Sequence, residues 1–227
     1  MALILSIETS TSSCSAALHK DGKTIAGREL HEPQLAASRL AVLIDEIIGE
    51  VGIEPGEVQA VAVSAGPGSY TGLRIGVATA KGFCYAMDIP IIAVNSLVLL
   101  AEQARGNASS GELLCPMIDA RRMEVYSMLL DTNLKEVDPV AARIIDETSY
   151  KDWLSKKRVH FFGTGSDKCR EALRHPNANF ISGIVPSALA MGRLAESRFN
   201  AKQFEDTATF EPLYLKDFLI RKPKSLV

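Results

Sequence analysis

Ala2-Leu-Ile-Leu-Ser-Ile-Glu8, together with the residues that follow it to about position 60, decides the fold class of this chain. Three short strands are predicted at residues 2–8, 13–19 and 24–31, because each is rich in apolar or β-branched residues and is bounded by turn formers. The turn Lys20-Asp-Gly-Lys23 favours a hairpin, since Asp-Gly readily adopts the positive φ angles that tight hairpin turns need. The chain is therefore expected to begin with three consecutive antiparallel strands.

Helices and strands then alternate up to about residue 105. The stripe Leu40, Leu43, Ile44, Ile47, Ile48 and Val51 predicts an amphipathic helix, and Gly52 is placed to end it. A buried strand at 58–64, a helix at 71–87, a strand at 89–94 and a helix starting at Asn95 or Ser96 follow. The order βββαβαβα predicts a mixed sheet with helices on its faces.

The polar, breaker-rich segment 106–112 is the expected boundary between two lobes. We assign residues 1–106 to a first lobe, completed by a helix near 186–200, residues 107–185 to a second lobe, and 212–227 to a C-terminal tail that frays over 221–227. Further strands are expected at 113–119, 123–130, 141–145, 159–162 and 180–181. Further helices are expected at 148–156, 167–173 and 187–199.

Composition excludes several classes of protein. The 227 residues are 47% hydrophobic and 23% charged, with a net charge of −2, which lacks the basic bias of a stand-alone nucleic-acid binder. The four cysteines are scattered and typical of reduced thiols. The first residues lack the basic region of a signal peptide, and no apolar run approaches the roughly 20 residues of a membrane span. We expect a soluble, cytoplasmic protein without a membrane contact.

The glycine-rich segment Ser64-Ala-Gly-Pro-Gly-Ser-Tyr-Thr-Gly72 lies between a predicted strand and a predicted helix. Exposed N–H groups at a helix start can bind an anion. The segment is neither a Walker loop nor G-x-G-x-x-G, and Pro67 removes one N–H donor. A phosphate site here is therefore the less favoured hypothesis.

The same segment continues into a stripe of small residues with a spacing of four. Glycine inside a helix costs about 0.5–1 kcal/mol relative to alanine, so close approach of another backbone must compensate. Either the protein's own sheet or another subunit could approach. Because Leu73, Val77 and Phe83 or Cys84 give the opposite side an apolar character that can serve the internal core, we favour a subunit interface. The interface is assigned to Gly68, Gly72, Leu73, Gly76 and Ala80.

The turn Glu8-Thr-Ser-Thr-Ser-Ser13 joins the first two strands, where actin, Hsp70 and the sugar kinases carry Asp-x-Gly-Thr to hold phosphate and Mg²⁺. Glu8, Thr9, Ser10 and Thr11 align with that motif and are weak candidates for nucleotide binding. Alternatively, these hydroxyls satisfy local backbone groups. Asp119-Ala-Arg-Arg122 brings one acid and two guanidinium groups to a strand end, either as a site or as a solvated hairpin with an Asx-turn.

Catalytic constellations are missing from the sequence. The four histidines form no H-x-x-x-H or H-E-x-x-H pair, so no helix-borne metal site is expected. No G-x-S-x-G nucleophile elbow occurs. We therefore assign no catalytic residue and no metal ligand.

Four sequence blocks resemble the TsaB (formerly YeaZ) family. They are Leu5-Ser-Ile-Glu-Thr-Ser10, Gly66-Pro-Gly-Ser-Tyr-Thr-Gly-Leu-Arg-Ile-Gly76, Ile118-Asp-Ala-Arg-Arg122 with Glu124-Val-Tyr126, and Pro212-Leu-Tyr-Leu215. The second block is highly specific. The chain departs from the family at Glu8, where many members have Asp, at Tyr70, where Phe is frequent, and at Lys216, where Arg is usual.

This resemblance implies a bacterial protein with the two-lobed α/β ASKHA (actin/Hsp70/sugar-kinase-like) fold, each lobe a mixed sheet flanked by helices. It implies a non-catalytic subunit that binds and activates the transferase TsaD, which forms N6-threonylcarbamoyladenosine (t6A) at position 37 of tRNAs reading ANN codons. It also implies that helices of the first lobe form the TsaD heterodimer or a homodimer, and that the ATPase TsaE joins the complex. Transfer RNA would be met only through that complex.

Two enzymatic alternatives remain open from the sequence. One is an ASKHA-type small-molecule kinase or ATPase, and the other, less favoured, is a peptidase, a class to which TsaD relatives were once assigned. The subunit hypothesis requires no cofactor, although ATP or ADP can sit at the subunit interface. Mg²⁺-dependent nucleotide binding by the isolated chain distinguishes the kinase from the subunit.

Overall fold

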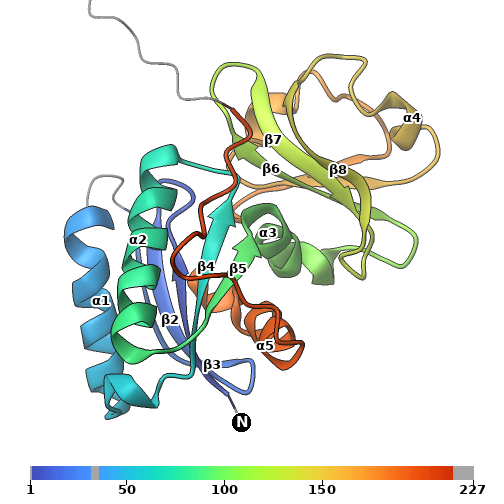
Figure 1. Ribbon diagram of the computed structural model, residues 1–227. Coiled ribbons are helices and arrows are strands. Elements are labelled where there is room, and N and C mark those ends of the chain that lie inside the picture. The colour runs from blue at the N-terminus through green and yellow to red at the C-terminus, as the bar shows by residue number, and fades with distance from the viewer. Residues whose placement is uncertain (1, 32–35, 217–227) are drawn as a thin grey trace, which may run out of the picture.

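The computed structural model describes residues 2–31 and 36–216, which build two five-stranded sheets, one in each lobe (Figure 1). The first sheet contains β1 (Leu3–Glu8), β2 (Cys14–Lys20), β3 (Lys23–Leu30), β4 (Ala60–Gly66) and β5 (Ile91–Asn95). The second sheet contains β6 (Leu113–Asp119), β7 (Glu124–Leu130), β8 (Glu136–Ile144), β9 (Val159–Phe162) and β10 (Ala178–Ile181).

Both sheets have the same strand order. It runs β3-β2-β1-β4-β5 in the first lobe and β8-β7-β6-β9-β10 in the second. In each case three antiparallel strands are followed by two parallel ones. The hairpin between β2 and β3 turns at Asp21 and Gly22, whose φ angles of 52° and 71° confirm the predicted turn. The two lobes thus share one topology.

Helices cover the first sheet on both faces (Figure 1). On one face lie α1 (Ala36–Val51) and α2 (Tyr70–Met87), and on the other lies α5 (Gly192–Asn200). The short α3 (Ser96–Ala104) packs against both sheets, and Asn95 begins it by accepting hydrogen bonds from the N–H groups of Leu97 and Val98. The helix expected to complete the first lobe is α5.

The alternation of side chains along β1 and β4 divides the core of the first lobe. Leu5 and Val63 face α1 and α2, whereas Ile4 and Ala62 face the layer that contains α5. This two-sided burial explains why both strands are almost continuously apolar.

The second lobe contains less helix than the sequence predicts. The helix expected at 148–156 is the single turn α4 (Lys151–Leu154), and the one expected at 167–173 is a 3₁₀ turn, Asp167–Cys169. The last expected helix begins five residues late, at Gly192, after a separate 3₁₀ turn. A Cβ atom on Gly192 would lie 2.5 Å from the carbonyl oxygen of Gly22, so the chain bends where the two segments touch.

The chain after α5 returns along the first lobe to the space between the lobes (Figure 1). The N–H of Glu205 donates to the carbonyl of Ile91 at 3.0 Å, and that of Leu213 donates to the carbonyl of Ala65 at 2.7 Å. Residues 205–216 are called the strap below. The expected fraying of residues 221–227 lies outside the described part of the chain.

Candidate functional site

A cleft of about 730 Å³ lies between the two lobes, and it is bordered by segments from both. The first lobe contributes the β1–β2 turn, the glycine-rich turn and the start of α2. The second lobe contributes the β6–β7 turn and Thr164, and the end of the strap closes one side. The lining residues are Ser10, Thr11, Ser12, Pro67, Gly68, Ser69, Tyr70, Thr71, Ile118, Asp119, Ala120, Arg121, Tyr126, Thr164, Leu213, Tyr214, Leu215 and Lys216.

Glu8, the acid of the first turn, is fully buried. One carboxyl oxygen accepts a hydrogen bond from the N–H of Ser10 at 2.5 Å, and the other accepts one from the Ser64 hydroxyl. Burial raises the pKa of Glu8 to about 7, while its hydrogen bonds with Ser10 act in the opposite direction. The carboxyl is thus held inside the lobe and away from the cleft.

Only two of the four candidates for nucleotide binding line the cleft. Thr9 is buried and its hydroxyl donates to the carbonyl of Gly72 at 2.8 Å. Ser10 and Thr11 line the cleft, although Ser10 is itself buried. The structure therefore brings Ser10 and Thr11, but not Glu8 and Thr9, to the candidate site.

The glycine stripe of α2 faces the interior of the chain, which corrects the expectation that it meets another subunit. A Cβ atom would lie 2.2 Å from the Ser10 carbonyl oxygen at Gly68 and 2.0 Å from that of Thr9 at Gly72. At Gly76 it would lie 2.2 Å from the Thr9 hydroxyl oxygen.

Leu73 and Ala80, the two larger members of the predicted interface, are completely buried and support the same conclusion. The close approach that compensates for helix-interior glycine is therefore the packing of α2 on its own β1–β2 turn. The five residues assigned to an interface form an internal contact instead.

The β6–β7 turn presents charged groups at the cleft. Asp119 accepts a hydrogen bond from the N–H of Arg121 at 2.8 Å, which is the Asx-turn considered as an alternative, and Lys168 pairs with the same carboxylate. Lys168 also donates to the carbonyl of Glu124 at 2.7 Å. The Asx-turn is confirmed, and because Asp119 and Arg121 also line the cleft, a role of this turn as a site stays a prediction.

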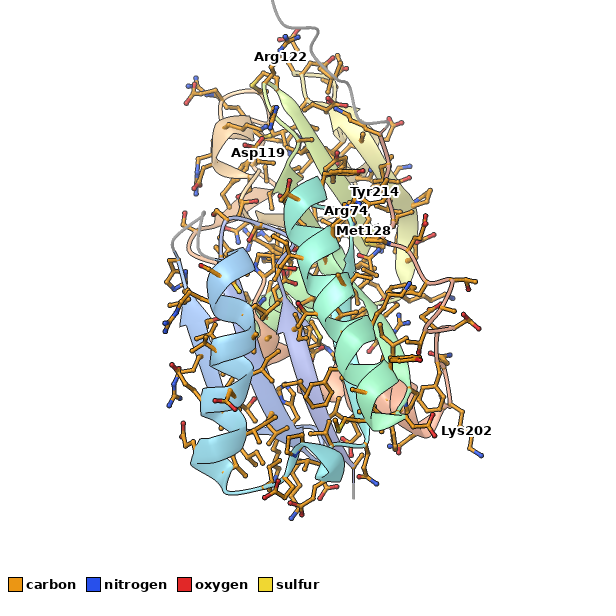
Figure 2. All side chains as sticks on the ribbon, turned by 60° about the vertical axis from the view of Figure 1, so that its left-hand side comes forward. Arg74, Asp119, Arg122, Met128, Lys202 and Tyr214 are labelled. Carbon is orange, nitrogen blue, oxygen red and sulfur yellow. The ribbon has the colours of Figure 1, made fainter. Side chains whose placement is uncertain are left out.

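The strap joins the two lobes at the cleft. The ring of Tyr214 packs against that of Tyr70 with centroids 4.8 Å apart, and Lys216 forms an ion pair with Glu124 on β7. In Figure 2, Tyr214 and Arg74 lie beside the end of α2 that faces the second lobe, Asp119 lies near the same end, and Arg122 lies farther out on the second lobe. The sequence gives no signal that Tyr214 is the partner of Tyr70, which lies 144 residues earlier in the chain.

Metal sites and membrane spans are the next two classes of feature, considered over residues 2–31 and 36–216. In that part of the chain, no three His, Cys, Asp or Glu side chains lie close enough together to hold a metal ion. None of its helices has both the length and the apolar character needed to span a bilayer. What the cleft offers to a ligand is hydroxyl groups from both lobes together with the cations of Arg121 and Lys216.

Comparisons with known proteins give consistent matches. The sequence model of the family described as TsaD, tRNA N6-adenosine threonylcarbamoyltransferase, matches residues 33–221. The tRNA threonylcarbamoyladenosine biosynthesis protein TsaB of Haemophilus influenzae is 28% identical over 223 residues, covering 94% of this chain and 93% of that protein. TsaB of Escherichia coli is 38% identical over 124 residues, 54% of this chain and 52% of that protein. The structure of YeaZ from Pseudomonas aeruginosa superposes with a TM-score of 0.82 at 27% identity, covering 95% of this chain and all of that one.

Proposed function

The chain belongs to the TsaB (YeaZ) family, and from that premise we propose that it is a non-catalytic subunit that binds and activates a TsaD-type transferase. The reaction served is threonylcarbamoyl transfer to N6 of adenosine 37 in tRNAs that read ANN codons. A role in t6A biosynthesis follows from the names of the relatives, and the assignment of the chemistry to the partner is our inference.

The observation that carries the proposal is the burial of Glu8 in the two-lobed ASKHA fold of this chain. In that fold the acid of the first turn serves phosphate and metal binding. Here Ser64 and the Ser10 N–H hold the carboxyl inside the lobe, and burial favours its neutral form. A neutral, enclosed carboxyl is a poor ligand for Mg²⁺. This favours the role of a non-catalytic subunit for the chain over that of a phosphoryl-transfer enzyme.

For the partner we propose the outer face of α1 and α2, opposite the buried glycine stripe. Its residues are exposed, and several are small or apolar. Tyr85 is 86% exposed and Val42 39%, while a Cβ atom on Gly49 or Gly82 would meet no neighbour within 4 Å. Such a face admits close approach of another helix. The homodimer expected from the resemblance would use the same face and compete with the heterodimer.

We propose that TsaE and the nucleotide bind to the heterodimer and not to the isolated chain. We place the TsaE ATPase on the heterodimer, and we place ATP or ADP at the interface between subunits, since Glu8 and Thr9 of the chain's own first turn are buried and do not line the cleft. No cofactor is needed for the role proposed here.

A matched pair of substitutions tests the interface. Gly82→Arg puts a long cation on the proposed face, and Gly106→Arg puts the same side chain at another open glycine, outside α1 and α2. Each variant is co-purified with the TsaD-type transferase of the same organism, and t6A formation is measured by mass spectrometry of tRNA digests. We expect Gly82→Arg to lose both the complex and t6A, and Gly106→Arg to retain them.

Two results would contradict the proposal. One is a wild-type chain that forms no complex with the transferase and leaves t6A formation unchanged when it is omitted. The other is Mg²⁺-dependent ATP turnover by the highly purified isolated chain, which would favour the kinase alternative.

A further inference from the structure

The β6–β7 turn has an unusual backbone at two consecutive arginines. Arg121 has a φ angle of 73° and Arg122 one of 51°, a region that side chains other than those of Gly, Asn and Asp rarely adopt. The turn is held by the Asx hydrogen bond to Asp119 and by the Glu124 N–H, which donates to the Arg121 carbonyl at 3.2 Å. A backbone held in this region at a cleft indicates that the side chains there serve a purpose other than stability.

The carboxylates beside this turn are already neutralised. Asp119 pairs with Lys168, and Glu124 pairs with Lys216. Among the ion pairs found within the described residues, none involves the guanidinium groups of Arg121 and Arg122, and both residues are exposed. The turn therefore presents two cations to solvent, of which Arg121 lines the cleft and Arg122 follows it in the turn.

The first lobe faces the same region with a further cation and with hydrogen-bond donors. Arg74 is exposed near the start of α2, and its guanidinium donates to the Tyr70 hydroxyl at 3.0 Å (Figure 2). Behind the rim, the cleft is lined by hydroxyl side chains from both lobes, namely Ser10, Thr11, Ser12, Ser69, Thr71 and Thr164. The carboxylate of Glu211 acts electrostatically on the hydroxyl of Tyr214, beside these donors.

We propose that the Arg121–Arg122 turn binds the phosphate backbone of RNA at the mouth of the interlobe cleft. Two solvent-facing guanidinium groups with hydroxyl donors behind them suit successive phosphates, because arginine and hydroxyl side chains are the common donors to phosphate oxygens. The choice of RNA as the anion rests on the proposed function, in which a tRNA is the substrate of the complex. The chain thus contacts the substrate directly instead of only holding the transferase.

The backbone of the turn allows a substitution that separates function from stability. The double variant Arg121→Asn, Arg122→Gly removes both cations and introduces residues that favour positive φ. We expect it to fold with an unchanged or higher Tm. The control Lys156→Gln, Lys157→Gln removes the same charge from an exposed stretch of the second lobe that does not line the cleft.

Binding is measured by fluorescence anisotropy with a labelled transcript of a tRNA that reads an ANN codon, at 50 and 200 mM salt. Both the isolated chain and its complex with the transferase are titrated. Loss of two phosphate contacts lowers the magnitude of the slope of log K against log salt by about 1.4–1.8, so the loss of affinity relative to wild type should be roughly tenfold larger at 50 mM salt than at 200 mM. The control variant is expected to stay within about twofold of wild type.

Three results would overturn the inference. They are a wild-type chain that binds the transcript neither alone nor in the complex, a double variant that binds like wild type, and a control that loses as much affinity as the double variant. A double variant that loses the transferase but keeps its affinity for the transcript would assign the turn to a protein contact instead. The Gly82→Arg variant tests the proposed function separately. The RNA contact and the proposed function can therefore be refuted independently of each other.

Discussion

Gly72→Ala, a change of one methyl group, tests the central packing contact of the molecule. The added Cβ atom would lie 2.0 Å from the carbonyl oxygen of Thr9, whereas real Cβ contacts essentially never fall below 3.0 Å. The β1–β2 turn must move by about 1 Å, and the hydrogen bond from the Thr9 hydroxyl to the Gly72 carbonyl moves with it. Overpacking costs about 1–3 kcal/mol and a strained hydrogen bond about 1 kcal/mol, while alanine in a helix recovers about 0.5–1 kcal/mol. The free energy of unfolding should therefore fall by about 1–3 kcal/mol.

Gly82→Ala in the same helix supplies the control. Nothing lies within 4 Å of its added Cβ atom, so only helix propensity changes and the free energy of unfolding should rise by about 0.5–1 kcal/mol. Both variants and wild type are unfolded in urea and followed by circular dichroism, with the m value checked for two-state behaviour. If Gly72→Ala proved as stable as Gly82→Ala, the glycine face would be open, and the interface hypothesis for the stripe would stand again.

Two further predictions concern buried ionisable groups. The pKa of Glu8 is raised from 4.5 to about 7, so its contribution to stability is complete below pH 4.5 and falls by about 3 kcal/mol as the pH rises to about 7. In urea unfolding at pH 5 and pH 8, Glu8→Gln should therefore lose less stability between the two pH values than wild type does. An equal loss in both proteins would refute the assignment. Burial raises the pKa of all four thiols, to about 11 for Cys14, Cys84 and Cys169 and about 12 for Cys115. Native protein at pH 8 should react slowly with a thiol reagent and unfolded protein with four equivalents, and rapid native labelling would contradict the enclosed cores.

Local sequence patterns predicted most of the first lobe because each of its elements is decided by neighbouring residues. The Asp21-Gly22 hairpin, the cap at Asn95 and the end of α1 at Gly52 depend only on backbone preferences within a few residues. Most strands of both sheets follow from their apolar runs, and 113–119 and 159–162 were predicted with the observed bounds. The strand expected at 141–145 was placed too late, because β8 (Glu136–Ile144) begins in a polar stretch that has no apolar run. The helices of the second lobe were overestimated, since their length depends on tertiary contacts that local patterns do not show.

The orientation of the glycine stripe could not be read from its spacing. A period of four places the small residues on one side of α2, but it does not say which neighbour meets that side. The neighbour is the carbonyl of Thr9, 63 residues earlier in the chain. For the same reason the ion pair of Lys216 with Glu124, 92 residues apart, gave no signal, and the cleft could be assembled only from the structure.

The packing of α2 on the first turn and the charges at the rim of the cleft are linked. Because Gly72 admits the Thr9 carbonyl, the turn packs under the helix and Glu8 is enclosed, so only Ser10 and Thr11 of the four candidates for nucleotide binding line the cleft. The cleft nevertheless keeps a volume of about 730 Å³ and a lining of hydroxyl groups. In the RNA contact that we propose, the phosphates are bound at the other wall, where the turn at Arg121 carries exposed cations. A first turn reopened by substitution should therefore alter the affinity for nucleotides without altering the affinity for RNA.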